Sequence, residues 1–152
     1  MLVIICIWYN YKRKWGDIMN NGYGQQIVST KANTLYALSK VIKKSKIEKM
    51  YILPVAEFEN NRENVLRDIT ETYGGEQIIV RSSSSKEDSF KTSNAGHYES
   101  ILGIDSGDSE QVNSAIEKVI ASYQKDIEIL DHEQILVQRQ AQNVKFSGVI
   151  FT

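Results

Sequence analysis

The residues best suited to chemistry are an arginine that ends an apolar run and the serines that directly follow it. The segment reads Val80-Arg81-Ser82-Ser83 and opens a polar stretch that closes with Asn94-Ala95-Gly96. A fixed guanidinium, backbone N–H groups and small residues are the components of a phosphate-binding site. The same pattern also fits an ordinary surface loop with an arginine at a strand end. Neither the Walker lysine loop nor Gly-x-Gly-x-x-Gly is present in the sequence.

A few other side chains carry weaker signals. Lys31 lies at the start of a helix-like pattern, where its charge opposes the positive end of the helix dipole, and the alternative is a solvated lysine. His97 could act as an acid or a base, although a half-buried strand histidine is the simpler interpretation. Glu87 and Asp88 could bind a cation or only hydrate their loop. No spacing of cysteine, histidine or acidic residues predicts a metal site within the chain.

These residues must be positioned by helices and strands that the apolar spacing predicts. Apolar residues recur at helical spacing in 32–42, 61–73 and 112–123. Apolar runs typical of strands occupy 50–53, 77–81, 97–104, 135–139 and 147–151. Gly74 is expected to end the second helix, because glycine readily adopts the left-handed conformation found at helix ends. Asp108 with Gln111 resembles a capping box before the third helix. This mixture of helices and strands predicts an α+β fold.

Composition narrows the class of protein. The chain has 152 residues, which fits one domain. It carries 18 Lys+Arg against 19 Asp+Glu, so a general nucleic-acid-binding role is not expected. A single cysteine excludes an internal disulfide and a thiolate zinc cage. The apolar run 2–9 is far shorter than the roughly 20 residues of a membrane helix, so no membrane partner is expected and a cytoplasmic setting is the default.

Both ends of the sequence differ from those of an ordinary domain. Residues 1–18 combine an apolar run with a basic segment ahead of Met19. We interpret them as a possible misassigned extension, with 19–152 as a partial domain. The sequence closes on an apolar strand-like run without a polar tail, and such an edge favours aggregation. We therefore expect a fragment, completed by a missing C-terminal half or by a partner subunit.

Five segments in order resemble the ATP-binding domain of the phosphoenolpyruvate synthase and pyruvate phosphate dikinase family. They are similar to that family's Gly-Gly-Lys-x-x-x-Leu, Val-Arg-Ser-Ser-x-x-x-Glu-Asp, Phe-Ala-Gly-Gln-x-Glu-Thr-x-Leu, Val-Gln-x-Met and Ser-Gly-Val-x-Phe-Thr motifs. The matching segments are 29–35, 80–88, 93–102, 135–139 and 147–152. The main departure is that Ser29 and Thr30 replace the two glycines before the lysine.

The resemblance implies an ATP-grasp-like fold, with this chain as the first, N-terminal subdomain of a PEP/pyruvate-binding domain that is incomplete at its C-terminus. It implies ATP as the ligand, and it implies that Lys31 and Arg81 contact the phosphates and act in catalysis. The nucleotide-binding residues that it implies are Lys31, Arg81, Ser82, Ser83, Ala95, Gly96, His97 and Gln138. The acidic residues that hold Mg²⁺ in the family are expected beyond the end of this chain.

Three functions follow from these observations. The first is the ATP-binding part of a phosphoenolpyruvate synthase-like phosphotransferase, a kinase that transfers phosphoryl from ATP to a histidine carrier or a small acceptor. The chain would then be inactive alone. The alternative is a non-catalytic remnant or binding module that retains the nucleotide-binding fold. A third hypothesis, a generic α+β domain whose serine loop binds another anion, leaves the five ordered segments unexplained.

Overall fold

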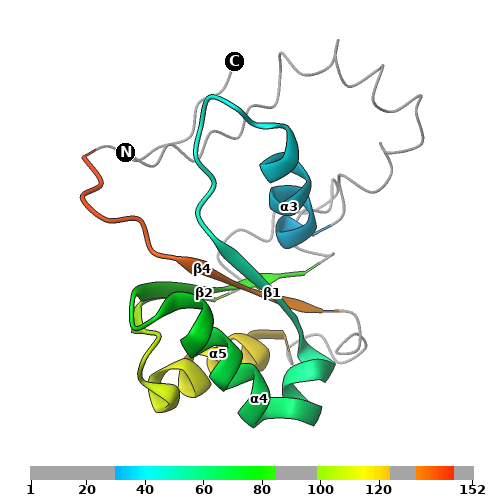
Figure 1. Cartoon of the computed structure of the whole chain (residues 1–152). Helices are drawn as coiled ribbons and strands as arrows, with labels where there is room; N and C mark the ends of the chain where they lie inside the picture. Colours follow the sequence, from blue (N-terminus) through cyan, green and yellow to red (C-terminus); the bar gives the residue numbers. More distant parts are fainter. Residues whose placement is uncertain (1–29, 85–98, 124–132, 146–152) are drawn as a thin grey trace. The chain divides into compact units, whose positions relative to one another are not determined.

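A computed structural model of the chain describes residues 30–84, 99–123 and 133–145. Within these ranges helices and strands alternate irregularly along the chain (Figure 1). In sequence order the elements are α3 (Lys31–Val41), β1 (Met50–Pro54), α4 (Val55–Tyr73), β2 (Gln77–Ser83), β3 (Ser100–Asp105), α5 (Ser109–Tyr123) and β4 (Gln134–Arg139). The α+β class predicted from the sequence is confirmed.

The chain divides into two compact units, and the sheet belongs to one of them. This sheet unit comprises Thr30–Ala32 and Glu48–Gln140. The second unit consists of the other residues and includes most of α3. The first turn of α3, with Lys31, therefore belongs to the same unit as the sheet, and every contact discussed below lies within that unit.

The sheet has four strands in the order β1-β4-β2-β3, and each strand is antiparallel to its neighbours. Three consecutive apolar residues of the central strand β4, Ile135, Leu136 and Val137, are fully buried. β2 continues for two residues beyond Arg81, where the sequence pattern predicts its end. The extension forms because Ser82 and Ser83 pair with Ile135 and Gln134 of β4.

Helices α4 and α5 cover one face of the sheet (Figure 1). Ile78 and Val80 of β2 are fully buried in the core under these helices. Successive side chains of a strand point to opposite faces, so Ile79, Arg81 and Ser83 lie on the other face, which we call the second face. The largest fully buried side chains of the helix-covered core are Leu53, Phe58, Ile69, Ile78, Ile116 and Ile135.

Helix α4 is longer than the apolar spacing predicts. It begins at Val55, directly after Pro54, whereas the spacing predicts a start at Asn61. The backbone of Asn61 is non-helical (φ −135°, ψ 35°), and this kink interrupts the periodic pattern. The other end agrees with the prediction: Gly74 (φ 59°) closes the helix by donating its N–H to the C=O of Thr70 at 2.8 Å.

Helix α5 begins after the predicted N-cap residue Asp108, although the box is not reciprocal, because the N–H of Asp108 donates to the C=O of Asp105 at 3.1 Å. The carboxylate of Asp108 accepts the backbone N–H groups of Glu110 (3.0 Å) and Gln111 (3.1 Å). The side-chain amide of Gln111 donates to the same carboxylate at 2.7 Å. These hydrogen bonds, above all the one from the backbone N–H of Gln111, hold the pKa of Asp108 below its usual range. The local sequence therefore determines where this helix starts.

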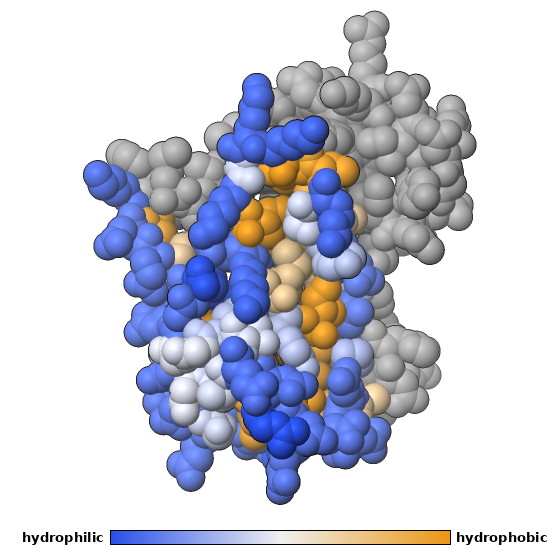
Figure 2. All heavy atoms as spheres, viewed as in Figure 1, coloured by the Kyte–Doolittle hydropathy of each residue, from blue (hydrophilic) through white to orange (hydrophobic). Residues whose placement is uncertain are grey.

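Polar residues cover most of the described surface in the view of Figure 2, with a narrow band of apolar residues among them. Of the large apolar side chains described, Leu102 on the edge strand β3 is the most exposed, at 62%. None of the described helices has the length and apolar character needed to cross a membrane. The possible extension 1–18, the predicted strand 147–151 and the start of the predicted strand 97–104 lie outside the described residues.

Candidate functional site

The start of α3 is hydrogen-bonded directly to the end of β2. The ammonium of Lys31 donates to the C=O of Ser82 at 3.3 Å, and the backbone N–H of Ala32 donates to the hydroxyl of Ser83 at 2.8 Å. Ala32 and Ser83 are both 0% exposed. The lysine motif and the arginine–serine motif, 51 residues apart in the sequence, therefore form one structural feature.

Ser83 caps α3 from another element of the fold. The first N–H groups of a helix lack partners within the helix, and the sequence predicts a local cap from Ser29 or Thr30. The N–H of Ala32 donates to a serine of β2, and the Thr30 hydroxyl donates to Oε1 of Gln134 at 2.8 Å. The strand end therefore supplies a cap that nearby sequence cannot reveal.

A buried tyrosine hydroxyl joins the ends of β2 and β4. The hydroxyl of Tyr123, on the last residue of α5, accepts the backbone N–H of Ser83 at 2.7 Å. It donates to the C=O of Gln134 at 2.5 Å. Tyr123 is 4% exposed. We call Thr30, Ala32, Ser83, Tyr123 and Gln134 the strand-end cluster, because together they connect two strand ends to two helices.

A buried carboxylate extends the polar contacts next to this cluster. The hydroxyl of Ser84 donates to Oε1 of Glu133 at 2.9 Å, and the two residues are 1% and 4% exposed. A buried carboxylate is unfavourable unless hydrogen bonds compensate for the lost hydration. The backbone C=O of Glu133 also accepts the N–H of Val55 at 3.0 Å, which connects the start of α4 to the same region.

Arg81 lies on the second face, and the Nε of its guanidinium is buried. Its Cα pairs with Leu136 of β4 and with Ser100 of β3, so the residue is in the interior of the sheet. Its Nε atom is buried and has no hydrogen-bond partner among the described residues. A buried donor without a partner costs about 1–3 kcal/mol. An anionic ligand bound here would satisfy the donor and remove that cost.

Gln138 lies on the same face as Arg81, one strand away. In β4 it pairs with Ile79 of β2 and Met50 of β1, two residues along from the partner of Arg81. Diagonal neighbours of this kind are within reach of long side chains. Gln138 is 9% exposed, and its amide makes no hydrogen bond to other residues in the described part of the chain. Its donors and acceptors are therefore available for a ligand on the second face.

The structure brings most of the predicted site residues into one region. Lys31 contacts Ser82, and Arg81 and Gln138 share the second face. The hydroxyl of Ser83 is engaged with the start of α3. The predicted residues 95–97 (Ala95, Gly96 and His97) lie outside the described residues.

Sequence reasoning missed two members of the strand-end cluster, because it assigned Tyr123 to an apolar helix face and Gln134 to no role. The one signal that could have singled out Tyr123 is its type. A tyrosine ends the otherwise aliphatic stripe of α5, and a buried tyrosine needs a partner for its hydroxyl.

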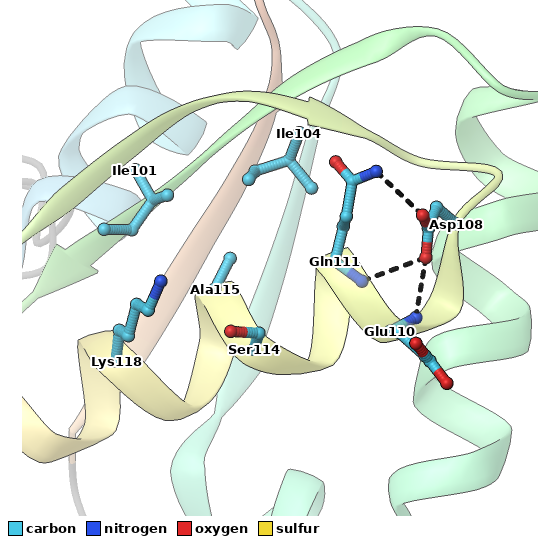
Figure 3. Close-up of a pocket in the computed structure, with 8 residues that line it drawn as sticks. All are labelled: Ile101, Ile104, Asp108, Glu110, Gln111, Ser114, Ala115 and Lys118. Carbon is cyan, nitrogen blue, oxygen red and sulfur yellow. Dashed lines mark hydrogen bonds between the residues drawn. The ribbon is translucent and has the colours of Figure 1, made fainter.

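A hollow lies on the side of the sheet opposite to Arg81, between β3 and α5 (Figure 3). It has a volume of about 300 Å³ and is lined by Ile101, Ile104, Asp108, Glu110, Gln111, Ser114, Ala115 and Lys118. Ile101 and Ile104 pair with Val80 and Ile78, which face the helix-covered core. The hollow is therefore on the other face from Arg81, and one of its two acidic residues, Asp108, caps α5.

Within the described residues, no group of three or more His, Cys, Asp or Glu side chains is placed to hold a metal ion. The candidate site is defined by Arg81 and Gln138 on the second face and by Lys31 at the C=O of Ser82. Their donors suit an anionic ligand with hydrogen-bond acceptors.

Comparison with known families identifies the domain to which these residues belong. The family described as pyruvate phosphate dikinase, AMP/ATP-binding domain, matches residues 17–152. No curated protein and no solved structure compared with the chain matches it significantly. The family match covers the lysine motif, the arginine–serine strand and the Gln138 strand in a single alignment. The resemblance noted in the sequence is thus confirmed, and the chain belongs to the family of pyruvate phosphate dikinase AMP/ATP-binding domains.

Proposed function

We propose that the second face of this AMP/ATP-binding domain holds the phosphates of ATP for a phosphoenolpyruvate synthase-like phosphotransferase. The reaction would transfer phosphoryl from ATP to a histidine carrier or to a small acceptor. The observation that best supports the proposal is the buried Nε of Arg81, which has no hydrogen-bond partner among the described residues. Arg81 is followed in the same strand by Ser82, whose C=O accepts the ammonium of Lys31.

Each side chain would have a distinct part in binding. The guanidinium of Arg81 can present parallel N–H donors to two phosphate oxygens, which is the geometry that arginine offers to oxyanions. Lys31, held by the C=O of Ser82, would add a second positive charge beside the same phosphates. Gln138 would contact the nucleotide from the neighbouring strand. Fixed cations and donors are the main requirement of phosphoryl transfer, because the transition state mostly redistributes negative charge.

The arrangement fits ATP better than it fits a metal ion. ATP would satisfy the buried donor of Arg81, whereas the described residues contain no acidic cluster for Mg²⁺. The proposal therefore assigns Mg²⁺ no ligand among these residues and no step. The contribution of this domain is to bind and orient the phosphates and to balance their charge.

The test is a calorimetric titration of the full chain with ATP, comparing wild type with Arg81→Ala and Arg62→Ala. Arg62 is the matched control because it is an exposed arginine on α4, paired with Glu117 at 2.6 Å and remote from the second face. We expect Arg81→Ala to weaken ATP binding by about 1.5–3 kcal/mol, the usual contribution of a charged hydrogen bond. Arg62→Ala should change affinity by less than about twofold.

Two outcomes would contradict the proposal. Equal affinities of wild type and Arg81→Ala would mean that Arg81 does not bind the phosphates. The absence of any ATP binding by the wild type at millimolar concentrations would favour the non-catalytic remnant over the phosphotransferase. A thermal melt with and without ATP gives an independent check, because a bound ligand raises the unfolding temperature.

A further inference from the structure

We propose that the hydroxyl of Tyr123 is a positioning group for nucleotide binding, which sets the location of the cationic start of α3. The inference rests on the proposed function, because it concerns how Lys31 is held beside the phosphate site. Tyr123 itself faces the helix-covered core and is not expected to touch the ligand. It would act through the backbone of Ser83.

The hydroxyl occupies the last rung of the β2–β4 ladder. The N–H of Gln140 donates to the C=O of Gln77 at 2.8 Å. Hydrogen-bonded pairs alternate with non-bonded pairs along an antiparallel ladder, so every second residue pair of β2 and β4, counted from Gln77 and Gln140, should exchange backbone hydrogen bonds. The pair of Ser83 and Gln134 belongs to that series. Here the Tyr123 hydroxyl connects the N–H and the C=O that a direct bond would join. It therefore acts as a spacer that holds the two strand ends apart.

The position of this rung determines where α3 starts. The C=O of Ser82 accepts the ammonium of Lys31, and the hydroxyl of Ser83 accepts the N–H of Ala32. Both acceptors flank the peptide N–H that Tyr123 holds. If the spacer is removed, the strand ends can close or admit water, and both acceptors move. Lys31 would then lose its fixed position relative to Arg81.

The chain provides a matched control for the deleted hydroxyl. Tyr73 on α4 is 3% exposed, and its hydroxyl donates to the C=O of Val137 of β4 at 2.8 Å. Tyr73→Phe and Tyr123→Phe each remove one buried hydroxyl that is bonded to a carbonyl of the same strand. Only Tyr123 is bonded to the strand end that holds α3. A general loss of stability should affect both variants, whereas a loss of positioning should affect only Tyr123→Phe.

The experiment measures amide hydrogen exchange and ATP affinity in the full chain for wild type, Tyr123→Phe and Tyr73→Phe. Relative to Val80 in the core, the N–H of Ala32 should exchange about tenfold faster in Tyr123→Phe and at the wild-type rate in Tyr73→Phe. ATP binding should weaken about tenfold in Tyr123→Phe and by less than about twofold in Tyr73→Phe. Equal Ala32 exchange in the two variants, or equal ATP affinities, would overturn the inference.

Failure of the proposed function would be recognised separately. If the wild type does not bind ATP, the proposed function fails, and the exchange of Ala32 still decides whether Tyr123 positions α3. A double-mutant cycle adds a further test: in a Ser83→Ala background, Tyr123→Phe should cause no additional change in Ala32 exchange. Additive changes would show that Tyr123 does not act through Ser83.

A measurement on the wild type keeps the inference testable if Tyr123→Phe does not fold. The buried hydroxyl proton of Tyr123 should exchange slowly and show a nuclear Overhauser effect to the N–H of Ser83. A rapidly exchanging hydroxyl proton without that contact would overturn the inference.

Discussion

Replacing Arg81 with methionine should stabilise the domain while weakening nucleotide binding. The Nε of Arg81 is buried without a hydrogen-bond partner among the described residues, and such a donor costs about 1–3 kcal/mol. Methionine retains much of the aliphatic length of the side chain and removes the donor. Because Arg81 as a whole is only partly buried, we expect the lower part of that range, a gain of about 1–1.5 kcal/mol in the free energy of unfolding.

The assay is urea denaturation followed by far-ultraviolet circular dichroism, with Arg62→Met as the control. Arg62 is exposed, is paired with Glu117 at 2.6 Å and lies 4.8 Å above the ring centroid of Phe58. Its replacement should therefore lower stability by about 0.5–1 kcal/mol. The two substitutions are expected to change stability in opposite directions. A loss of stability in Arg81→Met as large as that in Arg62→Met would refute the reasoning, because it would mean that Arg81 already has a stabilising partner.

Two further predictions concern the helix ends. Asp108→Ala should lower the stability of the domain at neutral pH. Hydrogen bonds from Gln111 lower the pKa of Asp108, so its contribution is present above about pH 4 and disappears as the pH falls through the folded-state pKa. Urea unfolding at pH 7 and at pH 3 should show the difference from wild type shrinking in acid, and a constant difference would contradict this account. Gly74→Ala should lower the free energy of unfolding by about 1–2 kcal/mol in the same assay at neutral pH, because Gly74 has a φ of 59°. An added Cβ would meet no atom within 4 Å, so the cost is conformational alone. An unchanged stability would exclude a strained left-handed residue at this position.

Local sequence was sufficient for the elements whose signals lie within a few residues. The N-cap at Asp108 and the glycine stop at Gly74 were both predicted and both form, whereas the return bond of a capping box from Gln111 does not. The start of α4 was missed, because the kink at Asn61 separates its first turns from the periodic part of the helix. The extension of β2 through Ser83 was missed for a different reason: serine does not favour strands by itself, and its pairing with β4 decides the conformation.

For the site, the sequence by itself determined which residues are the candidate phosphate-binding cations and to which family the chain belongs. It identified Arg81 and Lys31 as cations that suit phosphates, and the order of the motifs predicted the nucleotide-binding domain that the family match confirms. Only the tertiary structure decided how these cations are held. Ser83 accepts the N–H of Ala32 at the start of α3, and Tyr123 bridges the strand ends. Both contacts depend on the packing of segments far apart in the chain. Hydrogen bonds between distant segments leave no periodic pattern in a sequence, since each partner is an ordinary residue until the fold brings the two together.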